Sequence, residues 1–282
     1  MTERPTGEYV LFEEVAHTYD QLPVEFFGSV GERLVRLAAV RTGNRVLDVG
    51  CGRGAVTVPA ARAAGPTGSV LGIDLSPSMV EETGLLARRS GLASVQTLVM
   101  DGQAPELAPA AFDAVVGSMS VHMLDDLPAA YRAYRTLLRP GGRLGLAAPA
   151  TDVETGPDGH ARVLGLRTIA DMARTYATGS GVYPNSESFG GQARLYTDLC
   201  QCGFEEVQLT VENAFIRAGS AYDVVRWTWT HGMRRLWERV EPPRRAALEE
   251  RIAGEIAADH VVDGQVVIPV PVLYATGMRP EE

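Results

Sequence analysis

The sequence predicts an α/β fold, a doubly wound sheet of seven mostly parallel strands that carries helical lid insertions. The main observation is that short apolar runs alternate with stretches of helical period between residues 44 and 148. A second observation is that glycine or an acidic residue follows several of these runs, as at the carboxyl ends of strands in ligand-binding sheets. The composition, 45% hydrophobic and 22% charged over 282 residues, is that of a globular protein and excludes collagen-like and disordered chains.

Strands are expected where an apolar run meets a turn signal. The expected strands are 45–50, 69–75, 94–101, 112–120, 143–150, 205–215 and 265–278. The first, RVLDVG, is a continuous apolar run that ends at a glycine, which is typical of a strand buried on both faces. In the last, Pro269 and Pro271 at alternate positions favour an edge or bulged strand over a central one.

Helices are expected between these strands and in the two longer gaps. The expected helices are 55–65, 77–91, 127–138, 161–177, 191–203, 222–240 and 242–260. Ser76 is a natural N-cap for the second of them, with Pro77 at the first helical position. The third is closed by the sequence RPGG at 139–142, which is expected to form a turn.

The regular alternation is interrupted twice, and these interruptions define the domain organisation. We expect an N-terminal helical cap at 1–43, a core at 44–150, 190–216 and 265–282, and insertions at 151–189 and 217–264. Each insertion is short and flanked by core strands, so neither is expected to bury a core of its own. The sequence therefore predicts that both insertions cover a binding site as a lid.

Charge and composition exclude several classes of function. The net charge of −9 and the absence of a basic run argue against a nucleic-acid partner. All 26 basic residues are arginine, so no lysine is available as a base or for a Schiff base. The N-terminus is charged and no apolar run approaches the roughly 18 residues that a membrane span needs. We therefore expect a cytoplasmic protein that has no membrane partner and is able to form homo-oligomers.

The cysteines predict neither a disulfide framework nor a metal site. Cys51, Cys200 and Cys202 are an odd number with one short pair, and no second cluster of cysteine or histidine completes a zinc site. We expect reduced thiols and no bound metal.

The strongest motif is the glycine-rich turn after the first strand. Residues 46–54, VLDVGCGRG, place glycines at alternate positions before a helix, where the backbone can approach a polar ligand closely. With Ala55, Gly50 and Gly52 also satisfy the dinucleotide-binding fingerprint. Asp74 ends the second strand, where a carboxylate accepts hydrogen bonds from ribose hydroxyls, and Asp101 ends the third.

Five motifs in this order resemble those of class I S-adenosylmethionine-dependent methyltransferases, in the branch similar to ubiquinone and menaquinone biosynthesis and small-molecule methyltransferases. They are VLDVGCGRG, GIDLSPSMV, VMDGQAPEL, FDAVVGSMSVHML and LLRPGGRL, within residues 45–148. The resemblance implies a Rossmann-like methyltransferase fold and S-adenosylmethionine as the cofactor, with S-adenosylhomocysteine as product. It also implies roles for particular residues. Gly50, Cys51 and Gly52 are expected to line the methionine and ribose portions, with Asp48 bracing the loop and Asp74 binding the ribose diol. Around the adenine, Leu75 and Met79 pack on the ring, and Asp101, Gly102 and Gln103 contact its edge. Ser118 lies near the sulfonium, and Tyr19 closes over the cofactor.

The acceptor is expected to be a small molecule, such as a specialised metabolite, methylated on O, N or C. Methyl transfer from a sulfonium needs mainly alignment, and a base only where the acceptor must lose a proton. His122, shortly after the fourth strand, is the candidate catalytic base, with His160 in the first insertion as a second candidate. His231 is expected to pack among aromatic residues. Trp227 and Trp229 point to different sides of a helix, so either a buried cap helix or an aromatic acceptor site fits them.

Two other functions are compatible with parts of the sequence. A methyltransferase fold that binds the cofactor but acts as a cyclase or scaffold would keep the same motifs. An NAD(P)-dependent oxidoreductase would share the dinucleotide fingerprint, but the acid two residues before the first glycine, the Asp101-Gly102 pair and the absence of lysine argue against it.

Overall fold

The computed structural model describes residues 8–150, 166–176 and 188–282. Its strands are β1 (Val24–Glu25), β2 (Arg45–Val49), β3 (Ser69–Asp74), β4 (Val95–Val99), β5 (Phe112–Ser118), β6 (Leu138–Pro149), β7 (Glu205–Ala218), β8 (Val261–Val262) and β9 (Gln265–Met278). Its α-helices are α1 (Glu8–Val15), α2 (Phe27–Leu37), α3 (Thr57–Ala64), α4 (Pro77–Arg89), α5 (Leu127–Leu137), α6 (Arg167–Tyr176), α7 (Gln192–Gln201), α8 (Ala221–Thr228), α9 (Arg234–Glu238) and α10 (Pro242–Asp259). Two short 3₁₀-helices, η1 (Val121–Met123) and η3 (Ser188–Gly190), complete the described elements.

The strands form one sheet in the order β1-β7-β9-β6-β5-β2-β3-β4, with β8 paired to β9. The strands from β4 to β6 pair in parallel, whereas β9, β7 and β1 pair antiparallel. The expected α/β class is confirmed, but seven strands is too few. Within the described residues the sheet has nine strands, because β1 and β8 have two residues each and no apolar run predicts them.

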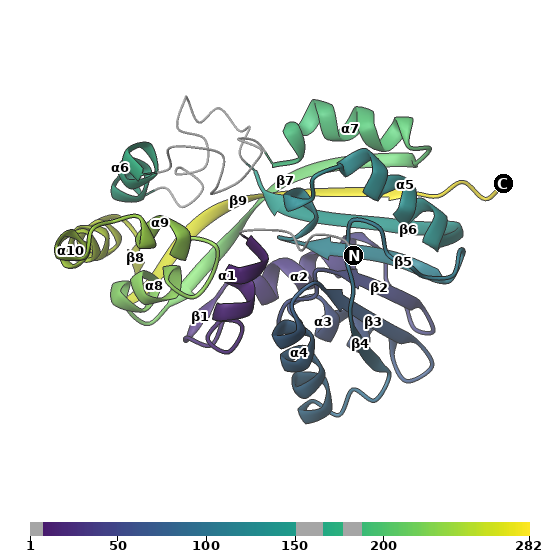
Figure 1. The fold of residues 1–282 in the computed structure, drawn as a ribbon, viewed down its shortest axis with the longest axis horizontal. Coiled ribbons are helices and arrows are strands. Elements are labelled where there is room, and N and C mark those ends of the chain that lie inside the picture. Colours follow the sequence, from purple (N-terminus) through teal and green to yellow (C-terminus); the bar gives the residue numbers. More distant parts are fainter. Residues whose placement is uncertain (1–7, 151–165, 177–187) are drawn as a thin grey trace.

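Two hydrophobic cores lie on opposite faces of the sheet (Figure 1). One contains Val30 and Leu34 of α2 with Ala60 and Ala61 of α3. The other contains residues of α5 and α7, including Tyr131. Helices therefore cover both faces, as expected for a doubly wound sheet.

The strands β7 and β9 run past the end of β6, where the second insertion begins. Pro149 at the end of β6 pairs with Val272, so residues 265–271 of β9 extend beyond β6 together with the end of β7. Helices α8, α9 and α10 connect these extended ends, and Figure 1 shows them gathered there with α6. Because β9 runs antiparallel to β6, this group lies at the carboxyl edge of the parallel strands.

The expectation of an edge or bulged strand at Pro269 and Pro271 holds only locally: β9 is a central strand between β6 and β7, but both prolines lie in the part of β9 that extends beyond β6. The Pro271 carbonyl accepts a hydrogen bond from the Ala150 amide, 2.9 Å away, so the Pro271 nitrogen faces the same side. Pro269, two residues earlier, faces that side too. Both prolines lie where β6 has ended, so their missing N–H groups cost no ladder hydrogen bond.

Two other local expectations differ from the structure. The RPGG sequence lies inside β6 as a bulge, because Phe112 pairs with Leu138 and Ala114 with Arg143. The single helix expected at 222–240 is broken into α8 and α9. The Trp237 indole folds back and donates to Thr228 Oγ1 at 2.8 Å, which holds the two short helices together across the break.

Candidate active site

The glycine-rich loop follows β2 and is tied to the neighbouring strand. The amides of Gly50 and Cys51 both donate to the Ile73 carbonyl of β3, at 2.8 and 2.9 Å. Gly50 has a φ of +70°, and a Cβ placed on it would lie 2.3 Å from the Cβ of Ser120. Only glycine fits this position, and the loop therefore passes directly beneath the segment that follows β5.

Asp48 lies under this loop and is fully buried. Its Oδ2 accepts a 2.5 Å hydrogen bond from Thr57 Oγ1, while Oδ1 has no hydrogen-bond partner among the described residues. Burial raises the pKa of Asp48 to about 7, and the nearby Asp74 adds to the rise, although the Thr57 hydrogen bond opposes it. A positively charged ligand close to Asp48 would therefore favour the ionised form of this carboxylate.

Asp74, at the end of β3, faces the loop. Its two oxygens accept from the amides of Gly52 and Ser76, each at 2.9 Å, and burial raises its pKa. Each oxygen keeps a further lone pair for a ligand hydroxyl.

The segment after β4 supplies exposed polar groups at the same edge. Asp101 accepts from the Gln103 amide at 2.8 Å. The Gln103 side chain forms two hydrogen bonds with the backbone of Asp126, and the Gly102 carbonyl accepts from the hydroxyl of Tyr134 at 2.6 Å. Helix α5 and the residue before it therefore hold this segment in place.

The remaining residues expected at the cofactor lie around this loop. Cys51 is buried, and burial raises the pKa of its thiol, which makes it a packing residue. Leu75 is half-buried, and Ser118 ends β5. Met79 is buried against residues of α1 and the turn after it, namely Leu11, Val15 and Ala16.

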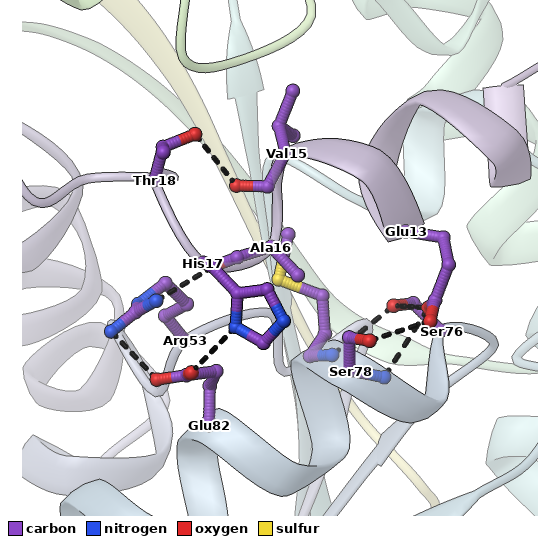
Figure 2. Close-up of polar contacts among 10 residues, drawn as sticks. Glu13, Val15, Ala16, His17, Thr18, Arg53, Ser76, Ser78 and Glu82 are labelled. Carbon is purple, nitrogen blue, oxygen red and sulfur yellow. Dashed lines mark hydrogen bonds and ion pairs between the residues drawn. The ribbon is translucent and has the colours of Figure 1, made fainter.

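Helix α1 is held against the site by two polar contacts (Figure 2). The carboxylate of Glu13 accepts hydrogen bonds from the hydroxyls of Ser76 and Ser78, each at 2.5 Å, at the start of α4. Although burial alone raises the pKa of Glu13, these hydrogen bonds hold it below its ordinary value.

The second contact joins α1 to the glycine loop. Arg53 pairs with Glu82 at 2.9 Å and donates to the Ala16 carbonyl at 2.6 Å, and His17 also meets Glu82, at 3.0 Å (Figure 2). The expectations for the site contained neither Glu13 nor Arg53. The only signal for Arg53 was its place inside the glycine motif.

The candidate histidines lie in three different settings. His122, in η1, is 8% exposed and lies edge-on to the ring of Phe189, with 5.9 Å between ring centroids. His231 is buried against Trp227, as expected, with 4.2 Å between centroids. His160 lies outside the described residues. Trp227 and Trp229 indeed face different partners, because Trp229 stacks on Trp237.

Asp48 leads to a prediction about stability. The free energy of unfolding of the cofactor-free protein should fall as the pH rises from about 4 to about 7, because folded Asp48 keeps a proton that the unfolded chain has released. Asp48→Asn should make this slope shallower, as measured by urea unfolding at pH values across the window. Identical slopes in the two proteins would show that Asp48 ionises normally.

The residues present fit S-adenosylmethionine. The unpartnered Oδ1 of Asp48 suits a cationic ligand, Asp74 can accept from a ribose diol, and at Gly52, where a Cβ would meet nothing within 4 Å, there is open space beside the backbone. In the described ranges, no helix combines the length and apolarity needed to cross a membrane, and no three histidine, cysteine, aspartate or glutamate side chains gather as a metal site.

Known proteins are similar to this chain in sequence. A family model described as a methyltransferase domain matches residues 46–142. The chain is 39% identical over 280 residues to a nocamycin O-methyltransferase of Saccharothrix syringae, covering 96% of this chain and 98% of that protein. It is 43% identical over 146 residues to an aklanonic acid methyltransferase of a Streptomyces strain, covering 52% of this chain and 66% of that protein.

A solved structure shares the fold. The structure of the [4+2]-cyclase SpnF superposes with a TM-score of 0.57 at 18% identity and covers 97% of this chain and 92% of that one. At this identity the likeness concerns the fold alone. The glycine loop, the two strand-end acids and the near full-length sequence match lead to one assignment: the chain belongs to the class I S-adenosylmethionine-dependent methyltransferases that act on small molecules.

Proposed function

We propose that this methyltransferase transfers the methyl group to an oxygen atom of a small organic molecule. The observation that carries the proposal is the extent of the match to the nocamycin O-methyltransferase, which spans 96% of this chain. It therefore includes the insertions as well as the cofactor-binding motifs. The name of the aklanonic acid methyltransferase also supports a small organic molecule as the acceptor.

In this proposal the protein acts mainly by alignment. S-adenosylmethionine, when bound, supplies a methyl group already activated on a sulfonium. The backbone of Gly50, Cys51 and Gly52 holds the methionine and ribose portions, Asp74 fixes the ribose hydroxyls, and residues 101–103 meet the adenine. Holding the acceptor oxygen in line with the methyl group lowers the barrier by as much as roughly 7–11 kcal/mol.

The segments outside the core form a cover over the acceptor. In this proposal its parts are the N-terminal cap at 1–43 and the insertions at 151–189 and 217–264, and the core segments are 44–150, 190–216 and 265–282. Residues 1–7 of the cap and most of the first insertion, 151–165 and 177–187, lie outside the described residues. The placement of α8, α9 and α10 at the carboxyl edge of the sheet supports this role for the second insertion. A cover of this kind excludes water from the reacting atoms. A cytoplasmic location and homo-oligomer formation stay predictions.

Asp74→Ala should weaken S-adenosylmethionine binding by about 1–3 kcal/mol, the scale for removing a charged hydrogen-bond partner. Isothermal titration calorimetry measures the change, with Asp259→Ala, an exposed aspartate of α10, as the matched control. An unchanged affinity in a folded Asp74→Ala protein would remove Asp74 from the cofactor site.

The proposed function is tested by turnover. The purified protein is incubated with S-adenosylmethionine and a panel of organic acids and phenols, and S-adenosylhomocysteine and the methylated products are followed by mass spectrometry. An O-methylated product supports the proposal, and transfer only to nitrogen or carbon contradicts it. A product of unchanged mass without S-adenosylhomocysteine would instead indicate a cyclase.

A further inference from the structure

Five aromatic rings meet between the turn after α1, the start of α2 and the end of α8. This aromatic cluster consists of Tyr19, Phe26, Phe27, Trp227 and His231. Tyr19 stacks on Phe27 with 5.3 Å between centroids, and Trp227 contacts Phe26, Phe27 and His231 at 5.9, 5.5 and 4.2 Å. Two stretches far apart in the sequence, 19–27 and 227–231, thus supply a single aromatic cluster.

The aromatic cluster buries polar atoms that have no partner among the described residues. One of them is Nε2 of His231. The other two, Nε1 of Trp227 and Oδ1 of the adjacent Asp20, face each other without forming a hydrogen bond of ordinary geometry. His231 is 8% exposed and Trp227 only 1%. Each buried polar atom without a partner costs about 1–3 kcal/mol, so a cluster used for packing alone would do better with phenylalanine at position 231.

Nε2 of His231 and Nε1 of Trp227 are both hydrogen-bond donors. Nδ1 of His231 accepts a long hydrogen bond, 3.5 Å, from the Met233 amide, which places the imidazole proton on Nε2. Burial lowers the pKa of His231 to about 3, so the ring is neutral. The indole Nε1 of Trp227 can only donate. A ligand here must therefore offer an oxygen that accepts hydrogen bonds.

Asp20 supplies the complementary acceptor. Burial raises its pKa to about 6, while the nearby Trp227 indole and the charge of Arg53 oppose the rise. Arg53 belongs to the glycine loop, so Asp20 connects the aromatic cluster to the expected cofactor site. The charge of Arg53 is already balanced by Glu82, so a ligand at the aromatic cluster does not need a full negative charge to balance it.

We infer that the aromatic cluster binds the methyl acceptor, and that this acceptor is a planar aromatic molecule with a carbonyl beside a hydroxyl. Trp227 and His231 donate to its carbonyl oxygen, Asp20 accepts from its hydroxyl, and the rings of Tyr19 and Phe27 pack on its face. The inference rests on the proposed function only for the ligand's role as acceptor. The binding site itself can be tested without any methyl transfer.

The test uses a hydroxynaphthoate, an aromatic probe with adjacent carboxyl and hydroxyl groups, and calorimetry on the protein loaded with S-adenosylhomocysteine. The probe should bind, and His231→Phe and Trp227→Phe should each weaken it by about tenfold, the loss of one hydrogen bond. Trp229→Phe is the matched control, because its Nε1 bonds to Glu249 at 3.0 Å outside the aromatic cluster. His231→Phe should leave cofactor affinity and the thermal midpoint at least as high as in the natural protein.

Two results would overturn the inference. One is the absence of probe binding to the natural protein, and the other is equal affinity in the His231→Phe and Trp227→Phe proteins. Failure of the proposed function has a different signature, in which the probe binds and depends on both residues but no oxygen of any acceptor is methylated.

Discussion

Gly50→Ala is expected to destabilise the protein by about 2–5 kcal/mol and to abolish measurable cofactor binding. A left-handed backbone costs a residue with a Cβ roughly 1–2 kcal/mol, and crowding in a packed interior adds about 1–3 kcal/mol. Both apply at Gly50, whose φ is +70° and whose added Cβ would lie 2.3 Å from the Cβ of Ser120. The loop must shift to relieve this contact, and the shift moves the amides that line the cofactor site.

Gly52→Ala separates the two contributions. Gly52 has a φ of +51°, but a Cβ there meets nothing within 4 Å, so only the backbone strain remains. Urea unfolding should place Gly52→Ala clearly above Gly50→Ala in stability, and adding Ser120→Gly to Gly50→Ala should recover part of the difference. Equal stability of the two single variants would show that Ser120 moves aside without cost.

The parts of the fold that the sequence predicted correctly depend on local signals. Strand β2 is confirmed, and it could be predicted because an apolar run ends at a glycine. Helix α4 is confirmed too, and it begins where Ser76 precedes Pro77. The Ser76 hydroxyl accepts from the Met79 amide at 3.1 Å, as an N-cap does. Such signals need only neighbouring residues, so a single sequence contains them.

The features that were missed depend on contacts between distant residues. Glu13 meets Ser76 across 63 positions and Arg33 meets Glu212 across 179, and neither pair has a sequence pattern. The central position of β9 could not be predicted from its prolines, because they fit there only where β6 has ended. The sequence predicted a role for Tyr19 but none for Asp20, because no local pattern shows that Asp20 is buried close to Trp227, more than two hundred residues later.

His122→Ala is expected to lower the rate of methyl transfer to a hydroxyl acceptor by roughly 10²–10⁴, the range for losing a general base. The hydroxyl must lose its proton as the new carbon–oxygen bond forms, and an imidazole after β5 can take that proton. Cofactor affinity should stay nearly unchanged, because the residues expected to bind adenosine come from the segments after β2, β3 and β4. Single-turnover kinetics with saturating S-adenosylmethionine measure the effect.

The packing of His122 sets the controls for this experiment. Its ring lies edge-on to Phe189, so alanine removes packing as well as the base. His122→Asn keeps a polar side chain of similar length that takes no proton, and a comparable rate loss in a protein with an unchanged thermal midpoint would assign the loss to proton transfer. Near-normal turnover in both variants would exclude His122 as the base. The barrier would then be lowered by alignment of the acceptor alone, and the residues to vary next would be Trp227, His231 and Asp20.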